Sequence, residues 1–253
     1  MMDTILTAKG LCKSYALNGV QNHVLSQVDV QIYEGDFTII MGASGSGKST
    51  LLYSLSGMDK ATAGKVIYNG MDIVSLKEKE LTKLRYADFG FVFQQMRLVS
   101  NLTLFENVAV SGYLNKSSSA NEVNKRADML LEQMGLAQIK QHLPSQSSGG
   151  EQQRCAIARA VINNPKLLFA DEPTGALNRK NTLEVLDLLT QINKDGQSIL
   201  MVTHDMKAAL RATRLLYLAD GNIIGDLSLA PYESENEKSR EIQVNAWLSS
   251  MEW

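Results

Sequence analysis

The stretch Gly42-Ala43-Ser44-Gly45-Ser46-Gly47-Lys48-Ser49 follows a short apolar run over residues 37–41 and precedes a helical pattern over 48–57. It has the P-loop pattern of Gly, four residues and Gly-Lys-Ser/Thr, in the strand, loop and helix setting that this motif requires. Glycines allow a turn tight enough for consecutive backbone N–H groups to converge on phosphate oxygens. We therefore expect a phosphate-binding loop here rather than a flexible glycine turn.

The residues of this loop suit a nucleotide with Mg²⁺. Lys48 can place its charge on the β- and γ-phosphates, and the Ser49 hydroxyl can ligate the metal. The positive end of the following helix adds to the field at the phosphates. The predicted nucleotide-binding residues of the loop are Gly42, Ser44, Gly45, Ser46, Gly47, Lys48, Ser49 and Thr50.

A pair of carboxylates ends a second apolar run, which covers residues 167–170. Asp171 suits the Mg²⁺ shell at the end of a parallel strand beside a P-loop. Glu172 points to the other side of the chain, where a carboxylate can orient or deprotonate water. Many strands end in acids at a turn, so the pair is informative only because a P-loop lies 123 residues upstream.

Length and composition indicate an ordinary globular protein of one large domain or two small ones. The chain has 253 residues, and 25 Lys and Arg against 27 Asp and Glu give a formal net charge of −2. Such a balance argues against a protein that coats nucleic acid. Cys12 and Cys155 cannot make a disulfide framework, and no apolar run approaches the roughly 18 to 20 residues that span a bilayer. With no signal peptide evident at the N-terminus, we expect a soluble intracellular protein.

The order of elements predicts a parallel sheet with crossover helices. Strands are expected over 4–41, 65–70, 89–93, 166–170 and 198–203, and helices over 48–57, 78–86, 103–114, 120–134, 150–163 and 179–194. Residues 232–241 are polar and lack an apolar period, which is typical of a linker.

Four further motifs resemble those of the ABC-type ATPases. Ser148-Gly149-Gly150-Glu151-Gln152 resembles the signature segment, 23 residues before Asp171; Gln94 resembles the Q-loop glutamine. His204 resembles the switch histidine, and Tyr15 the aromatic residue that stacks on adenine. Each residue alone has an ordinary structural explanation, but the set occurs in the family's order over residues 4–228.

The resemblance implies an α/β fold, namely the P-loop NTPase ABC ATPase fold. This fold has a RecA-like core, an antiparallel β subdomain and an inserted α-helical subdomain. The implied ATPase domain covers residues 1–231, with the helical subdomain at about 95–160. Residues 232–253 are then a polar linker and a C-terminal amphipathic helix.

The resemblance also implies a hydrolytic site for ATP and Mg²⁺. Its catalytic residues are Glu172, His204 and Gln94, and its metal ligands are Ser49, Gln94 and Asp171. Tyr15 holds the base. Family members work as head-to-tail dimers, so Ser148, Gly149 and Gly150 are expected to contact the ATP held by a second ATPase subunit.

The implied partners are that second copy and a transmembrane permease, with no nucleic acid. The chain would thus be cytoplasmic and peripheral on the cytoplasmic face of the cell membrane, which it touches only through the permease. Within the family the motifs are similar to those of stand-alone ATPases of the macrolide-export, lipoprotein-release and antimicrobial-peptide-resistance group. The alternatives are an ABC ATPase that drives transmembrane signalling to cell-wall hydrolases, and a soluble machine on ribosomes or DNA. A single P-loop and a short insert between Gln94 and Ser148 disfavour the last.

Two departures from the family's usual residues affect these expectations. Ser147 and Glu151 stand where the signature has Leu and Gln, and Glu151 adds a negative charge near the nucleotide. Asn178 replaces an Asp after the carboxylate pair, which puts communication across the dimer in doubt. We expect hydrolysis to persist, because neither change removes a catalytic group.

Two segments invite a docking role. Residues 96–110 are expected to receive a coupling helix of the permease, with apolar contacts from Met96, Leu98, Leu102 and Phe105. Val244, Trp247, Leu248 and Met251 form an apolar helical stripe. In both segments the alternative is ordinary packing against the protein itself, which we favour for the C-terminal stripe.

Overall fold

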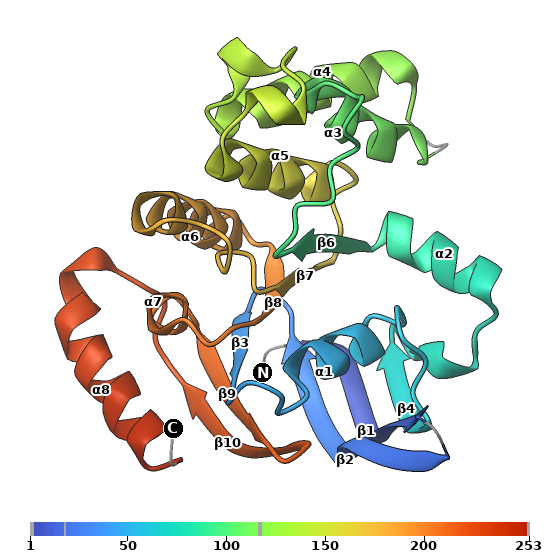
Figure 1. Ribbon diagram of the computed structural model, residues 1–253, viewed down its shortest axis with the longest axis vertical. Coiled ribbons are helices and arrows are strands. Elements are labelled where there is room, and N and C mark those ends of the chain that lie inside the picture. Colours follow the sequence, from blue (N-terminus) through green and yellow to red (C-terminus); the bar gives the residue numbers. More distant parts are fainter. Residues whose placement is uncertain (1–2, 18, 116–117, 252–253) are drawn as a thin grey trace. The chain divides into compact units, whose positions relative to one another are not determined.

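The computed structural model describes residues 3–17, 19–115 and 118–251. The chain divides into two compact units (Figure 1). The first consists of Met1–Leu81 with Gly196–Trp253, and the second of Thr82–Asp195. Both units combine strands and helices, so the α/β class expected from the sequence is confirmed.

An antiparallel sheet forms one part of the first unit, with strand order β2-β1-β4-β5. Its strands are β1 Thr4–Leu17, β2 Val20–Tyr33, β4 Ala63–Tyr68 and β5 Met71–Asp72, followed by the 3-10 turn η1 Ile73–Ser75. Val28, Val30 and Ile32 are buried on one face, as their alternation predicts. Gln27 has φ +51°, and the register of β1 and β2 shifts on passing it. This bulge is why Leu25 rather than Val24 is fully buried.

The first unit also contains a mainly parallel sheet. β3 (Phe37–Met41) is buried along its whole length and pairs in parallel with β8 (Ser198–Val202) and β9 (Arg214–Ala219). β10 (Asn222–Ser228) pairs antiparallel with β9. Helix α1 (Lys48–Leu55) follows β3, and helix α7 (Met206–Ala209) follows β8. The predicted strands at 37–41 and 198–203 are confirmed. β9 and β10 were not predicted, and β10 has a weak pattern because it only alternates exposed and half-buried residues.

The second unit is built on a parallel pair of strands, β6 (Phe89–Phe93) and β7 (Leu167–Asp171). Its helices and turns are α3 Leu104–Tyr113, α4 Ala120–Gln133, η2 Ala137–Ile139, η3 Pro144–Gln146, α5 Gly149–Val161 and α6 Arg179–Lys194, with α2 Glu78–Ala87 at the boundary of the units. A Cβ at Gly90 would lie 2.6 Å from the Ala160 carbonyl oxygen, so α5 runs directly over β6. Phe91 stacks on Phe169 of the neighbouring strand.

The prediction of a linker over residues 232–241 is wrong. The turn η4 (Ser234–Asn236) leads into helix α8, which begins at Glu237 and ends at Ser249. The sequence pattern misses this helix because the residue that it buries, Arg240, is charged and not apolar. Its guanidinium donates to the carbonyls of Leu210 (2.5 Å), Ala230 (2.7 Å) and Ala212.

The apolar stripe of α8 packs against its own unit, beside β9 and β10 (Figure 1). Val244 and Leu248 are buried, and Trp247 meets Tyr217 edge-on with ring centroids 6.4 Å apart. Met251 Sδ lies 2.8 Å from where a Cβ of Gly225 would be. The stripe is therefore covered, and only the other faces of α8 are available to a partner. Trp253 lies outside the described residues.

Arg240 provides a test of how firmly α8 is held. Arg240→Met should lower the free energy of unfolding by about 2–3 kcal/mol, because three carbonyls, two of them buried, lose their donor. Lys238→Met, an exposed position on the same helix, is the matched control and should change it by less than about 0.5 kcal/mol. Urea unfolding followed by circular dichroism measures the free energy of unfolding of both variants. Equal decreases would show that the hydrogen bonds of Arg240 do not stabilise α8.

Candidate functional site

The P-loop turn is possible only with glycine at its first and last bends. Gly42 has φ +153°, and a Cβ there would lie 2.2 Å from the Leu218 carbonyl oxygen. Gly47 has φ +101° and begins helix α1 in a left-handed conformation, with the Val24 carbonyl 3.1 Å from its Cβ position. Side chains at either position would push the loop away from β9 or β2. The loop is thus held close to its neighbours by backbone contact.

Two groups of the loop are prepared for an anion. Lys48 is buried, and its Nζ donates to the carbonyls of Gly42 (2.9 Å) and Ala43 (2.8 Å). Ser46 Oγ is buried with no hydrogen-bond partner among the described residues. A buried hydroxyl without a partner is costly, and a phosphate oxygen would satisfy it. The loop therefore fits the nucleotide phosphates expected from the sequence.

A pocket of about 410 Å³ lies against this loop within the first unit. Its walls come from three segments, residues 22–24, 43–46 and 217–221. His23 is one of the wall residues, and its Nδ1 lies 2.8 Å from Ser14 Oγ. Sequence reasoning assigned His23 no role, because it stands outside every motif. It lies near the loop because its neighbour Val24 packs against Gly47.

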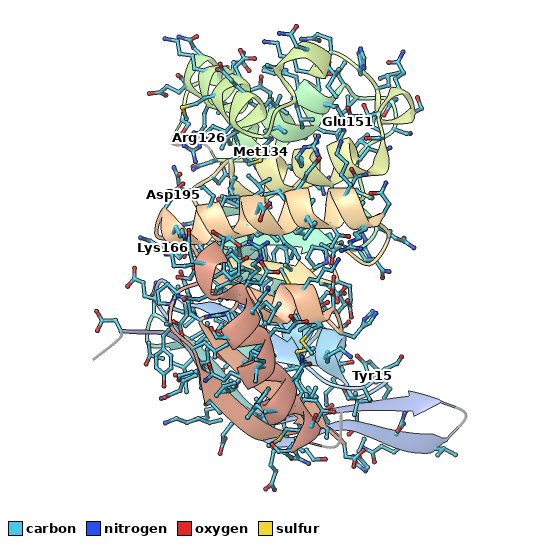
Figure 2. The ribbon with its side chains drawn as sticks, turned by 90° about the vertical axis from the view of Figure 1, so that its left-hand side faces the viewer. Tyr15, Arg126, Met134, Glu151, Lys166 and Asp195 are labelled. Carbon is cyan, nitrogen blue, oxygen red and sulfur yellow. The ribbon has the colours of Figure 1, made fainter. Side chains whose placement is uncertain are left out.

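Tyr15 projects from the β1–β2 hairpin and is 42% exposed (Figure 2). Its hydroxyl bonds to Asp59 (2.5 Å) and to the Thr50 hydroxyl of α1. Burial raises the pKa of Tyr15, and the Asp59 bond raises it further. Lys13 Nζ lies 4.7 Å from the ring centroid and pairs with Asp59. Tyr15 is thus tied to α1, with part of its ring left open for a base to stack.

His204 follows β8 and is exposed. In the parallel register Ile40 pairs with Val202, so the P-loop and His204 both leave the sheet at the carboxyl ends of adjacent strands. Asp205 then caps α7 by accepting the Lys207 N–H (2.8 Å). The structure therefore gathers Tyr15, the P-loop and His204 within the first unit.

The second unit gathers the remaining predicted catalytic residues. Phe93 pairs with Asp171, so Gln94 and Glu172 are the next residues on adjacent strands. The Gln94 amide lies against the turn after the carboxylates, 2.8 Å from the Cβ position of Gly175. Glu172 has φ +45°, a conformation that residues other than glycine adopt at a cost. Sequence patterns do not reveal this conformation, which Glu172 shares with turn residues such as Asn69 and Asp220.

The signature segment starts helix α5 of the second unit. Ser148 and Gly149 are exposed, whereas Gly150 is buried with its Cβ position 2.6 Å from the side chain of Asn181. Gly150 therefore has a structural reason to be glycine, since α5 crosses α6 there. Glu151 (labelled in Figure 2) accepts the N–H of Ser148 (2.7 Å) and its hydroxyl (2.8 Å).

Helix α5 also holds the segment around Gln94. The buried Gln153 donates to the Phe93 carbonyl (3.2 Å), and Arg159 donates to the carbonyls of Met96 (2.8 Å) and Arg97 (2.7 Å). Burial lowers the pKa of Arg159. The position of Gln94 thus depends on the helix that begins with the signature.

The residues expected to contact a coupling helix are less exposed than predicted. Met96, Leu98, Leu102 and Phe105 are all half-buried. The exposed apolar side chains of this region are Val99 (46%), Val110 (43%), Tyr113 (47%) and Leu114 (58%). The last three are spaced i, i+3 and i+4, so they share the face of α3 that the packing of the unit leaves uncovered.

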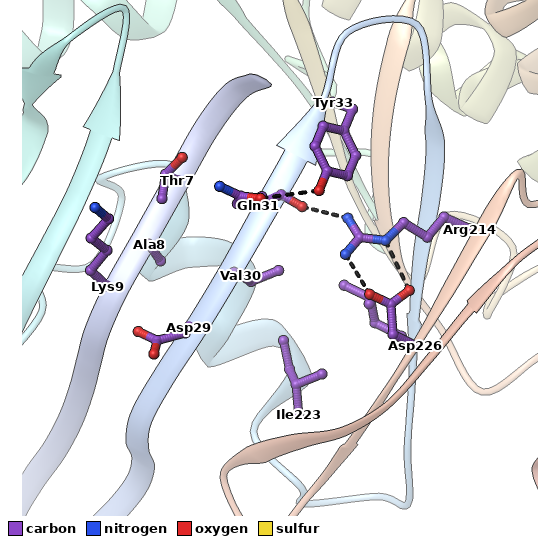
Figure 3. Close-up of a pocket in the computed structure, with 11 residues that line it drawn as sticks. Thr7, Ala8, Lys9, Asp29, Val30, Gln31, Tyr33, Arg214, Ile223 and Asp226 are labelled. Carbon is purple, nitrogen blue, oxygen red and sulfur yellow. Dashed lines mark hydrogen bonds and ion pairs between the residues drawn. The ribbon is translucent and has the colours of Figure 1, made fainter. Parts of the chain in front are cut away.

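A larger pocket of about 560 Å³ lies elsewhere in the first unit, between β2 and the β9–β10 hairpin (Figure 3). Arg214 lines this pocket, and its guanidinium donates two hydrogen bonds to Asp226 and one to the Gln31 carbonyl. The carboxylate of Asp226 therefore neutralises the charge of Arg214. Asp226 hydrogen bonding raises the pKa of Arg214 despite burial. An anion in this pocket would have to displace Asp226 to reach the guanidinium of Arg214.

Comparison with known proteins agrees with this arrangement. A model of the ABC transporter family matches residues 25–175. Two solved structures of the cassette MJ0796 are 39% identical to this chain and cover 90% of it and all of their own length, with a TM-score of 0.82. The chain belongs to the ABC transporter family. It is an ABC-type ATPase.

The solved ABC structures differ in what they contain. One MJ0796 structure is a dimeric post-hydrolysis state bound to ADP and phosphate, and the other is a dimeric bacterial ABC transporter cassette. CbiO1 from Clostridium perfringens, part of the ABC transporter complex CbiONQ, is 28% identical with a TM-score of 0.79. That match covers 98% of this chain and 97% of CbiO1.

Asn178, a departure from the usual ABC residue, has a clear role in the fold. It is the N-cap of α6, and its side chain accepts the N–H of Asn181 at 3.0 Å. Asn and Asp cap helices about equally well. The replacement of Asp by Asn therefore removes a charge without loss of the cap.

Substitution of Asn178 tests this interpretation. Asn178→Asp should leave the free energy of unfolding within about 0.5 kcal/mol of the parent, whereas Asn178→Ala should lower it by about 1 kcal/mol. Urea unfolding of the three proteins measures the difference. If Asn178→Ala unfolds with the same midpoint as the parent, the cap does not stabilise α6.

Proposed function

We propose that this chain is the ATP-hydrolysing subunit of an ABC transporter whose permease is a separate chain. The observation that carries the proposal is the P-loop, with its buried Lys48 and a buried Ser46 hydroxyl that has no hydrogen-bond partner in the described part of the chain. Among the described residues no helix has the length and apolar character needed to cross a membrane. CbiO1, a similar chain, is part of a transporter complex.

We assign ATP binding to the P-loop and Tyr15. The loop N–H groups and the end of α1 would face the phosphates, and Lys48 would exchange its carbonyl partners for β- and γ-phosphate oxygens. Ser49, Gln94 and Asp171 supply only oxygen ligands, the type that Mg²⁺ prefers. Bound Mg²⁺ would neutralise charge on the β- and γ-phosphates. Adenine would stack on the exposed part of the Tyr15 ring.

Hydrolysis is assigned to Glu172 and His204. A water oxygen attacks the γ-phosphorus as the bond to the ADP oxygen breaks, and Glu172 accepts the proton that the water loses. His204 would hold the γ-phosphate, and Gln94 would orient the water as well as the metal. The pairing of Phe93 with Asp171 supports this assignment, because it makes Gln94 and Glu172 the next residues on adjacent strands.

We further propose that two copies pair head to tail around two ATP molecules. Ser148, Gly149 and Gly150 of one copy would then contact the γ-phosphate bound by the other. The exposure of Ser148 and Gly149 at the N-terminus of α5 supports this role. The dimeric MJ0796 structures are the relevant precedent.

Glu172→Gln is the central test of the mechanism. The variant should bind ATP as the parent does, lose turnover by at least about a hundredfold, and accumulate as a closed dimer with MgATP. Turnover of the parent should rise more steeply than linearly with protein concentration, because each site needs two copies. ATPase assays over a concentration series and sedimentation with MgATP measure these effects.

Two further variants make the result specific. Glu132→Gln, an exposed carboxylate of the same unit, should keep parental turnover. Lys48→Ala should lose ATP binding itself. Parental turnover in Glu172→Gln would rule out Glu172 as the base.

The exposed face of α3 formed by Val110, Tyr113 and Leu114 is our candidate for the permease contact. Leu114→Ser with Val110→Ser should reduce co-purification of the permease by about tenfold or more, because apolar contact area is lost. ATP binding by the isolated chain should not change. Met129→Ser on α4, also exposed, is the matched control, and an equal loss in both would argue against this face.

The substrate class follows from the subgroup that the motifs resemble. We propose export, extraction or resistance involving amphipathic or peptide substrates. Signalling to cell-wall hydrolases, with no transported substrate, is the second candidate. The permease distinguishes them: a large extracytoplasmic substrate-handling domain supports the first function, and a hydrolase-binding loop supports the second.

A further inference from the structure

Three helices of the second unit begin with the same capping box. In α3, α4 and α5 a hydroxyl residue accepts the N–H of a glutamate three positions on, and the glutamate accepts the N–H and hydroxyl of that residue. The pairs are Thr103 with Glu106, Ser119 with Glu122, and Ser148 with Glu151. Of these three hydroxyl residues, Ser148 of α5 alone has a part in the proposed function, where it contacts the γ-phosphate bound by a second copy.

At the start of α5, the one hydroxyl proton of Ser148 is already used in a hydrogen bond. Ser148 Oγ donates to Glu151 Oε2 at 2.8 Å, and the same oxygen accepts the Ser148 N–H at 2.7 Å. In return the Glu151 N–H donates to Ser148 Oγ at 3.4 Å. Ser148 therefore has no hydrogen to offer a phosphate oxygen while this box is closed.

The carboxylate is also ionised. Hydrogen bonds from the Ser148 backbone and side chain lower the pKa of Glu151, with smaller contributions from the charges of Arg154 and His142. A phosphate that approached Ser148 would meet this negative charge at about the length of two hydrogen bonds. Like charges at that distance repel, even at a solvated surface.

We propose that Glu151 is a positioning residue that withholds the Ser148 hydroxyl from the nucleotide, so that ATP-driven pairing must first open the capping box. This inference rests on the proposed head-to-tail dimer. Glutamine in its place would keep an acceptor oxygen for the cap but remove the charge and weaken the bond to Ser148. Pairing should then need less ATP or less protein.

The test measures the dimer dissociation constant by sedimentation with saturating MgATP, in the Glu172→Gln background that stops turnover. Adding Glu151→Gln should tighten the dimer by about tenfold. Glu122→Gln is the matched control: it makes the same change to the capping box of Ser119 and should leave the dimer unchanged. The affinity of the monomer for ATP should shift equally in Glu151→Gln and Glu122→Gln. The urea midpoint of unfolding should also shift equally in the two variants.

A double-mutant cycle separates the withheld hydroxyl from a simple charge effect. If Glu151 acts through Ser148, Glu151→Gln should tighten the dimer less in a Ser148→Ala background than with Ser148 present.

Four outcomes would overturn the inference: no change of the dimer with Glu151→Gln, an equal change with Glu122→Gln, an unreduced effect in Ser148→Ala, or weaker pairing. The first two leave the proposed function standing if the Glu172→Gln protein itself pairs with ATP. If the Glu172→Gln protein stays monomeric with MgATP, both with and without Glu151→Gln, the proposed head-to-tail dimer is wrong as well.

Discussion

The close contact between the P-loop backbone and the end of β9 is the constraint on which the nucleotide site depends. At Gly42 the space for a side chain is filled by the Leu218 carbonyl, 2.2 Å from the Cβ position. The contact exists because β3 pairs in parallel with β9 on one side and β8 on the other. That pairing also sets His204 at the end of the strand next to the loop.

Helix α5 has the corresponding role in the second unit. Its first turn carries the signature residues, and Gly150 allows it to cross α6 at Asn181. Further along, Gln153 and Arg159 hold the backbone on both sides of Gln94. The signature and the Q-loop segment therefore belong to one packed body, and a displacement of α5 would displace both.

The departures from the usual ABC sequence have local structural explanations. Asn178 caps α6, and Glu151 completes the capping box of α5. The sequence suggested a negative charge near the nucleotide at Glu151 and altered communication across the dimer at Asn178. In the structure, Asn178 has the ordinary role of a helix cap, whereas Glu151 forms its cap with Ser148, the serine proposed to contact the ATP of a second copy.

The sequence by itself determined the motifs and many of the elements, although it missed β9, β10 and the start of α8. The buried run of β3, the ends of α6 and the P-loop follow from local periodicity and from glycines next to a lysine, which nearby residues alone dictate. Tertiary structure alone decided the clamp of Arg240 on Leu210, the place of His23 beside the loop, and the cover over the stripe of α8. A backbone carbonyl has the same chemistry at every residue, so no pattern shows which one a distant arginine will meet. The backbone conformation of Glu172 and the bond that occupies Ser148 belong to the same class, because backbone angles and hydroxyl partners are set only when the chain has packed.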